Sequence, residues 1–419
     1  MKTLPYAELF YKLKDEFSSG LSDLIVPGLG IKISERKFIS NTGILPGNNN
    51  YCCNKHNIDF PNPQNNLGSK GKTDLSSGGL LDLHDSEIRS NSSFEYYIVD
   101  SANSKNANKT PGRVIILFHG LNEKKWDKYL PWAYALHKNT SRPVILFPLA
   151  FHMGRAPAEW SNSRDMAKEA RRRADELAGN SHSSFVNAAI SSRLSANPER
   201  FFWTGMQSFN DIERLLCDIY EGRVEGLQKG TGADLFGYSI GAFFALILMM
   251  ANPGRLLSNS RLFTFCGGAT LDRMYPISRY IMDSKAASAV NSYYLELMNG
   301  DLSAAGRIGH YLDSGLHPYE SVFKLMLLYH HNKREREALL KKLEGRISAV
   351  TLMQDSVVPP AEVLNTLKGE MRNIKNTVDI EDFTYPYNHV TPFTLSEKFS
   401  TEPTDAFYRI MDRAGEFLR

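Results

Sequence analysis

The chain has 419 residues, a formal net charge of +3 and 23% charged residues, a composition typical of globular proteins. Its basic residues are dispersed and do not form the stripe of interleaved basic and aromatic residues that binds nucleic acid, so we expect no nucleic-acid partner. No apolar run approaches the roughly eighteen residues that span a bilayer. The start runs into the charged segment 12–16 without the apolar stretch of a secretory signal. We expect a cytoplasmic protein without a transmembrane segment.

Residues 1–93 differ from the rest and are expected to be a partly irregular N-terminal extension, because 43–79 is dense in Asn, Gly, Ser, Pro and Lys. The four cysteines, Cys52, Cys53, Cys217 and Cys266, are too few for a disulfide framework, so reduced thiols are expected. Cys52 and Cys53 with His56 lack a second pair of metal ligands. The sequence therefore predicts no metal site.

From Phe94 onward, short apolar runs alternate with longer helical patterns. Runs that are apolar at consecutive positions are typical of parallel strands covered on both faces, which predicts an α/β fold with a mostly parallel central sheet. The strand candidates are 94–99, 114–118, 144–147, 234–236, 262–265, 347–353 and, as a sheet edge, 377–383. The helix candidates between and after them are 211–220, 241–250, 362–374 and 405–418.

Two connections are too long for plain crossovers, with about 85 residues before the strand at Asp234 and about 80 before the strand at Ile347. The second, 271–345, leaves and rejoins the sheet on its carboxyl side, where open α/β sheets bind ligands. We interpret 271–345 as an inserted helical cap on a core made of 94–270 and 346–419.

Gly237-Tyr238-Ser239-Ile240-Gly241 lies between a strand and an apolar helix. A serine on so tight a turn has a strained backbone, and larger residues two positions to either side would collide, so both glycines have a steric cause. Ser239 is the candidate nucleophile. The alternative is that the glycines only permit a close turn and that Ser239 caps the helix.

Acyl transfer requires a base for the serine and donors for the developing oxyanion. The amides of Ile240 and of Leu121, which follows His119-Gly120 at the end of a strand, are the candidate oxyanion donors. His119 suits organisation of this loop better than the role of base. His389, just past the last strand, is the candidate base.

Asp355, where the strand 347–353 ends, is the candidate carboxylate that orients His389. Asp272 is its rival, followed by Asp379 and Asp382. The remaining histidines of the cap segment are expected to face solvent or to be satisfied in the core: His310, His317, His330 and His331.

With these motifs in the order serine, acid, histidine, the chain resembles the α/β-hydrolase superfamily over about 94–270 and 346–419. The resemblance implies an α/β-hydrolase fold, with Ser239 as nucleophile, Asp355 as acid, His389 as base and Ile240 and Leu121 as oxyanion donors. The N-terminal extension, the insertion after Leu149 and the cap match nothing in the family pattern, so the resemblance fixes the chemistry better than the substrate.

We expect a serine hydrolase of the esterase or lipase type, acting on carboxylic esters of a small-molecule acyl substrate without a cofactor. A peptidase or an acyltransferase on the same triad stays open, as does a non-catalytic binding protein that uses the fold as a scaffold. Action at a membrane surface through Trp126, Trp132 and Trp160 is a further alternative, although scattered tryptophans are more often core residues.

Two further sequence patterns are expected to belong to helices and not to the candidate site. Ser208 or Asn210 is expected to cap the start of the helix that follows. Arg171-Arg172-Arg173 is interpreted as the solvated face of a helix.

Overall fold

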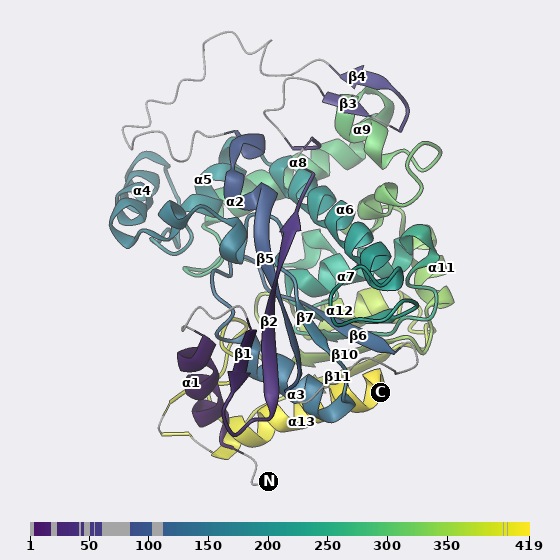
Figure 1. Ribbon diagram of the computed structural model, residues 1–419. Coiled ribbons are helices and arrows are strands. Elements are labelled where there is room, and N and C mark those ends of the chain that lie inside the picture. The colour runs from purple at the N-terminus through teal and green to yellow at the C-terminus, as the bar shows by residue number, and fades with distance from the viewer. Residues whose placement is uncertain are drawn as a thin grey trace.

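The computed structural model describes residues 4–17, 23–41, 43–45, 51–53, 55–60, 84–102, 112–396, 398–399 and 401–419. Within these residues the centre is a nine-stranded sheet of order β1-β2-β5-β7-β6-β8-β9-β10-β11 (Figure 1). Its strands are β1 (Asp23–Val26), β2 (Ile31–Ile39), β5 (Ser93–Ser101), β6 (Arg113–Phe118), β7 (Val144–Leu146), β8 (Gly232–Tyr238), β9 (Leu262–Phe265), β10 (Ile347–Leu352) and β11 (Thr377–Glu381). Six neighbouring strands are parallel to one another: β7, β6, β8, β9, β10 and β11. At the other edge, β1, β2 and β5 pair antiparallel. The predicted mostly parallel sheet is confirmed, as is the edge position of β11.

Successive residues of each buried strand point to opposite faces of the sheet, which therefore carries a hydrophobic core on each side. In β6, Ile115 and Leu117 belong to one core and Val114 and Ile116 to the other. The first core is covered by α1 (Tyr6–Phe17), α3 (Tyr129–Thr140) and α13 (Thr401–Leu418), the second by α6 (Arg200–Tyr220), α7 (Ile240–Ala251) and α12 (Pro360–Leu367) (Figure 1). This is the helix-flanked α/β architecture that the sequence predicts.

The strand order reverses next to β6. From β6 the chain passes through α3 to β7 on one side, then returns to place β8, β9, β10 and β11 in turn on the other side. The ends of β6 and β8 are adjacent, since Phe118 pairs with Gly237. Such a reversal opens a crevice at the carboxyl ends of the strands, where α/β proteins bind ligands.

The N-terminal segment contributes more to the sheet than its sequence predicts. Residues 1–93, expected to be an extension, supply β1 and β2, which continue the sheet beyond β5. The pattern of β2 is hard to recognise because the polar run 34–37 interrupts the alternation that begins with the buried Ile31 and Ile33. Within 43–79, where irregular structure was expected, β3 (Tyr51–Cys53) and β4 (Ile58–Phe60) form a hairpin, and most of the other residues of that segment lie outside the described ones.

Two predicted helix boundaries are wrong. Helix α6 begins at Arg200, so Ser208 and Asn210 lie inside it instead of capping its start. The Ser208 hydroxyl instead donates to the carbonyl of Thr204 one turn earlier (2.9 Å), which satisfies a polar side chain within a helix. Helix α12 ends at Leu367 rather than near 374, because Gly369 has φ +72° and turns the chain.

Both long connections are helical. The first holds α4 (Ser163–Glu176), α5 (Ala188–Ala196) and α6; the second holds α8 (Ser284–Asn299), α9 (Gly306–Leu312), α10 (Lys324–Leu327) and α11 (Lys333–Lys342). Trp126, Trp132 and Trp160 are buried, as expected of core residues. Among the described helices none is both long and apolar enough to cross a bilayer.

Candidate active site

Ser239 occupies the turn between β8 and α7 with φ 56° and ψ −122°, a backbone conformation that a residue with a side chain rarely adopts. A Cβ on Gly237 would lie 2.6 Å from Cα of Ala242, and one on Gly241 would lie 2.6 Å from the carbonyl oxygen of Phe118. Both glycines are therefore required by close backbone contacts. The contact of Gly241 also sets α7 directly against the end of β6.

The structure brings the three predicted triad side chains together in one hydrogen-bonded chain. Oγ of Ser239 lies 2.7 Å from Nε2 of His389, and Nδ1 of His389 lies 2.7 Å from Oδ2 of Asp355. All three residues are buried, with exposed fractions of 6%, 4% and 3% for Ser239, His389 and Asp355. Since the carboxylate accepts from Nδ1, the lone pair of Nε2 is directed at the serine hydroxyl.

Asp355 is held by the turn that follows β10. Its Oδ1 accepts hydrogen bonds from the amides of Val357 and Val358, each 2.9 Å long, which leaves Oδ2 for His389. The rival acids are engaged elsewhere. Asp272 accepts from Thr270 and the amide of Tyr329, Asp379 pairs with Arg413, and Asp382 accepts from Gln354 and Tyr387.

Two residues that the sequence did not single out support the His389 loop. The hydroxyl of Tyr238 donates to the carbonyl of His389, and their rings stack at 5.6 Å. Burial raises the pKa of Tyr238 well above its usual value, so the phenol stays protonated as a donor. The ammonium of Lys128 lies over the Tyr238 ring and donates to the carbonyl of Val390. Tyr238 lies within the nucleophile motif, but no local pattern reveals a partner 151 residues away.

The residues of both predicted oxyanion donors, Ile240 and Leu121, line the same pocket as Ser239. Ile240 begins α7, whose N-terminus favours negative charge, and Leu121 follows β6 in the loop that faces it. The hydroxyl of Tyr129 accepts from the amide of Gly120 (2.8 Å) and fixes this loop. Among the hydrogen bonds of the described residues, neither the Ile240 amide nor the Leu121 amide donates to a protein acceptor.

His119 is fully buried and organises this loop, as the sequence suggested. Its Nε2 accepts from the amide of Leu149 (3.0 Å), so the ring proton is on Nδ1, which donates to the carbonyl of Gly120 (2.8 Å). Burial, followed by the neighbouring His152, holds the pKa of His119 well below its usual value. The ring is therefore a neutral link between the β6 and β7 loops.

Free space opens on two sides of Ser239. On one side an apolar pocket is lined by Leu121, Ile240 and residues of the second insertion, including Met282 and Val290. Leu121 and Ile240 also line a neighbouring, mostly apolar pocket whose other walls come largely from the first insertion. On the other side a wider space, bordered by His389 and Lys128, opens toward solvent.

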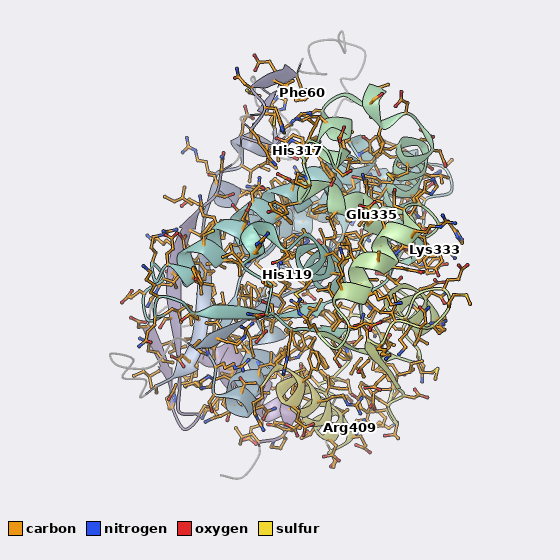
Figure 2. The ribbon with its side chains drawn as sticks, turned by 90° about the vertical axis from the view of Figure 1, so that its right-hand side faces the viewer. Phe60, His119, His317, Lys333, Glu335 and Arg409 are labelled. Atoms are coloured by element: carbon orange, nitrogen blue, oxygen red, sulfur yellow. The ribbon has the colours of Figure 1, made fainter. Side chains whose placement is uncertain are left out.

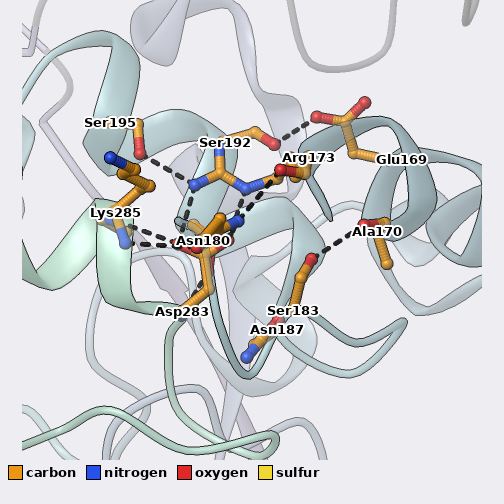
Figure 3. A network of polar contacts seen from close by, with 12 residues as sticks. Glu169, Ala170, Arg173, Asn180, Ser183, Asn187, Ser192, Ser195, Asp283 and Lys285 are labelled. Carbon is orange, nitrogen blue, oxygen red and sulfur yellow. Dashed lines mark hydrogen bonds and ion pairs between the residues drawn. The ribbon is translucent and has the colours of Figure 1, made fainter. Parts of the chain in front are cut away.

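The two insertions are joined by a buried ion pair. The guanidinium of Arg173 in α4 binds both carboxylate oxygens of Asp283 at 2.6 and 2.8 Å, and Asn180 donates to the same carboxylate (Figure 3). Asp283 also caps α8 by accepting from the amide of Ala286. Arg173 was expected on a solvated face; it is buried because α5 packs against α4 and Asp283, at the start of α8, pairs with the guanidinium.

The chain has the α/β-hydrolase fold. This fold is defined by a mostly parallel sheet in which a strand, a strained serine turn and a helix follow one another next to the point where the strand order reverses. Residues 4–419 match the sequence model of a family described as "Family of unknown function (DUF6051)", and the chain belongs to that family.

Solved structures similar to this one include three hydrolases of low identity. A thermostable esterase from Pseudomonas putida is 12% identical with a TM-score of 0.40, and the match covers 100% of this chain and 93% of that one. A carboxyl esterase from Tuber melanosporum is 11% identical (TM-score 0.42; 78% and 82% covered). The peroxisomal α/β-hydrolase Lpx1 from Saccharomyces cerevisiae is 11% identical (TM-score 0.39; 93% and 89% covered). A search of curated proteins finds no match.

Replacement of Gly241 by alanine is expected to destabilise the protein by more than about 3 kcal/mol or to prevent folding, because the new methyl group would meet backbone atoms that cannot move independently. Gly154→Ala is the matched control, since nothing lies within 4 Å of its Cβ position. Urea unfolding measures the free energy of unfolding of both variants. Equal stabilities for the two variants would refute the steric account of the turn.

Loss of the buried cation in Arg173→Met is expected to cost about 3–5 kcal/mol, because it leaves the carboxylate of Asp283 uncompensated. The double variant Arg173→Met/Asp283→Asn is expected to lose less than the sum of the two single variants. Lys168→Met breaks an exposed ion pair of the same helix and is expected to cost at most about 1 kcal/mol. Denaturant unfolding of the four variants measures these losses in the free energy of unfolding. Additive losses for Arg173 and Asp283 would contradict an energetic coupling between the two side chains.

Proposed function

We propose that the protein is a serine hydrolase that cleaves a carboxylic ester through an acyl-enzyme intermediate on Ser239. The observation that carries this proposal is the buried chain of two 2.7 Å contacts from Ser239 through His389 to Asp355. A serine hydroxyl is a weak nucleophile until a base removes its proton, and this arrangement supplies the base and the group that orients it.

In the proposed reaction, Nε2 of His389 takes the proton from Oγ of Ser239 as the oxygen attacks the acyl carbon. Asp355 holds the imidazole through Nδ1 and stabilises the imidazolium. The amides of Leu121 and Ile240 donate to the oxyanion, and the N-terminus of α7 favours its charge. The imidazolium then protonates the departing alcohol, and His389 activates the water that releases the acid.

The proposed substrate has an apolar acyl group. The pocket beside Ser239 is lined by aliphatic side chains and methionines from the second insertion, and by Leu121 and Ile240. We therefore propose 271–345 as a cap over the core of 94–270 and 346–419, completed by the first insertion through Arg173 and Asp283. No step of the proposed reaction involves a cofactor.

Ser239→Ala is expected to lower the turnover of p-nitrophenyl esters by about 10⁴-fold or more, since the remaining amides and pocket cannot replace the nucleophile. The same variant is expected to lose labelling by a fluorophosphonate probe while keeping its unfolding temperature. Ser208→Ala, a buried serine of α6, is the matched control and is expected to retain labelling.

The other readings of the site give different outcomes. Faster cleavage of aminopeptidase substrates than of esters would favour a peptidase, and transfer of the acyl group to an added alcohol in preference to water would favour an acyltransferase. A folded wild-type protein that neither reacts with the probe nor cleaves any acyl substrate would favour a non-catalytic binding protein and end the proposal.

The apolar pocket predicts an acyl-chain preference. The value of kcat/KM is expected to rise from acetyl to hexanoyl esters by up to about fourfold per added methylene, the equivalent of roughly 0.8 kcal/mol of burial. Ala287→Leu, which narrows this pocket, is expected to reduce the rise and to spare the acetyl ester. Leu295→Ala, at an exposed position of the same helix, is the control. A chain-length profile that Ala287→Leu leaves unchanged would contradict this placement of the acyl group.

A further inference from the structure

Four metal-binding side chains converge far from the serine turn in sequence. Sγ of Cys53 and one ring nitrogen each of His56, His310 and His317 all lie within 4.8 Å of one another. Cys53 and His56 come from the β3–β4 hairpin, His310 from α9 and His317 from the turn after α9. Figures 1 and 2 place this hairpin and His317 at the end of the molecule opposite α13.

Three of the six separations between these atoms are close to those of a tetrahedral metal site. Sγ of Cys53 lies 3.4 Å from Nδ1 of His56 and 3.4 Å from Nε2 of His317, and Nε2 of His317 lies 3.1 Å from Nε2 of His310. Tetrahedral zinc with its usual bond lengths separates two nitrogens by about 3.3 Å and a sulfur from a nitrogen by about 3.6 Å. The three rings lie edge to face, with centroids 4.8 to 5.1 Å apart, while one nitrogen of each lies within 4.8 Å of the other ligand atoms.

The surroundings resemble the outer shell of a metal site. Oε1 of Glu320 lies 3.2 Å from Nδ1 of His317, the nitrogen that faces away from the cluster. Carboxylates in this position orient a metal-binding imidazole and raise its basicity. The ring of Tyr311 stacks on His317 at 4.2 Å, and Phe60 packs against His310.

The hairpin itself needs an anchor. Strands β3 and β4 form a separate two-stranded sheet, and such a hairpin is marginally stable alone in water. Cys53 is buried against the cluster, whereas Cys52, its neighbour on the strand, points to the other face. The single thiol and three imidazoles thus lie where the hairpin meets α9.

We propose that Cys53, His56, His310 and His317 bind one Zn²⁺ ion that fastens the β3–β4 hairpin to α9. One thiolate and three imidazoles suit zinc, and four protein ligands close the coordination shell, which makes the site structural rather than catalytic. Binding releases the thiol proton of Cys53 to solvent and leaves the three imidazoles neutral. The sequence expectation of no second ligand pair is corrected, because His310 and His317 supply that pair from more than 250 residues away.

The test uses untagged full-length protein. Elemental analysis is expected to find about one zinc per chain in the wild type and in Cys52→Ser, and at least about tenfold less in Cys53→Ser and in His317→Ala. Glu320→Gln is expected to keep the site but to weaken zinc binding by about tenfold, as the loss of an orienting carboxylate does. After zinc removal, Co²⁺ is expected to give a thiolate-to-metal charge-transfer band and intense tetrahedral visible bands, absent in Cys53→Ser.

The proposal is independent of the esterase chemistry, since Cys53→Ser is expected to keep the reaction of Ser239 with the fluorophosphonate probe. A wild-type chain that contains less than about a tenth of an equivalent of zinc and takes up neither Zn²⁺ nor Co²⁺ would overturn it. Equal zinc in Cys53→Ser, His317→Ala and the wild type would overturn it as well, because the metal would then lie elsewhere.

Discussion

The contact between the start of α7 and the end of β6 is the constraint on which the candidate site depends. Gly241 lets the helix backbone approach the carbonyl oxygens of Phe118 and His119, and Gly237 lets the strand approach Ala242. With both contacts made, Ser239 has to adopt a positive φ, which lifts its side chain above the sheet edge. Just beyond the same contact, Leu121 lines the pocket beside Ser239 together with Ile240. One packing requirement therefore positions the serine and both candidate oxyanion donors.

Around this centre, the two insertions are held by buried charges. Arg173 and Asp283 join the two insertions, and Arg155 pairs with Asp211 between the β7 loop and α6 at 2.8 Å. Buried ion pairs contribute little net stability compared with apolar residues, but their geometry is specific, and removal of one partner is costly. They therefore suit segments that have to sit in one position above a pocket whose walls are otherwise apolar and permissive.

What could be predicted rests on local patterns. Consecutive apolar residues revealed the parallel strands, and the residues that follow those strands marked Ser239, Asp355 and His389 as candidates, which the structure brings together. Strand β2 was missed because charged residues interrupt its pattern, and the burial of Arg173 was missed because its partner, Asp283, lies 110 residues later. The role of Tyr238 toward His389 likewise depends on tertiary packing.

The Cys53 cluster could not be predicted for the same reason: its residues are brought together only by tertiary packing. Cys53 and His56 form a close pair within a segment of low apolar content, and His310 and His317 form another within a helical region. Neither pair alone indicates a metal site, since most histidines in proteins are ordinary surface or core residues and not metal ligands. Only the docking of the hairpin against α9 joins the two pairs. A metal ion there would provide the attachment energy that a hairpin of two three-residue strands lacks, just as buried charges fix the segments above the pocket.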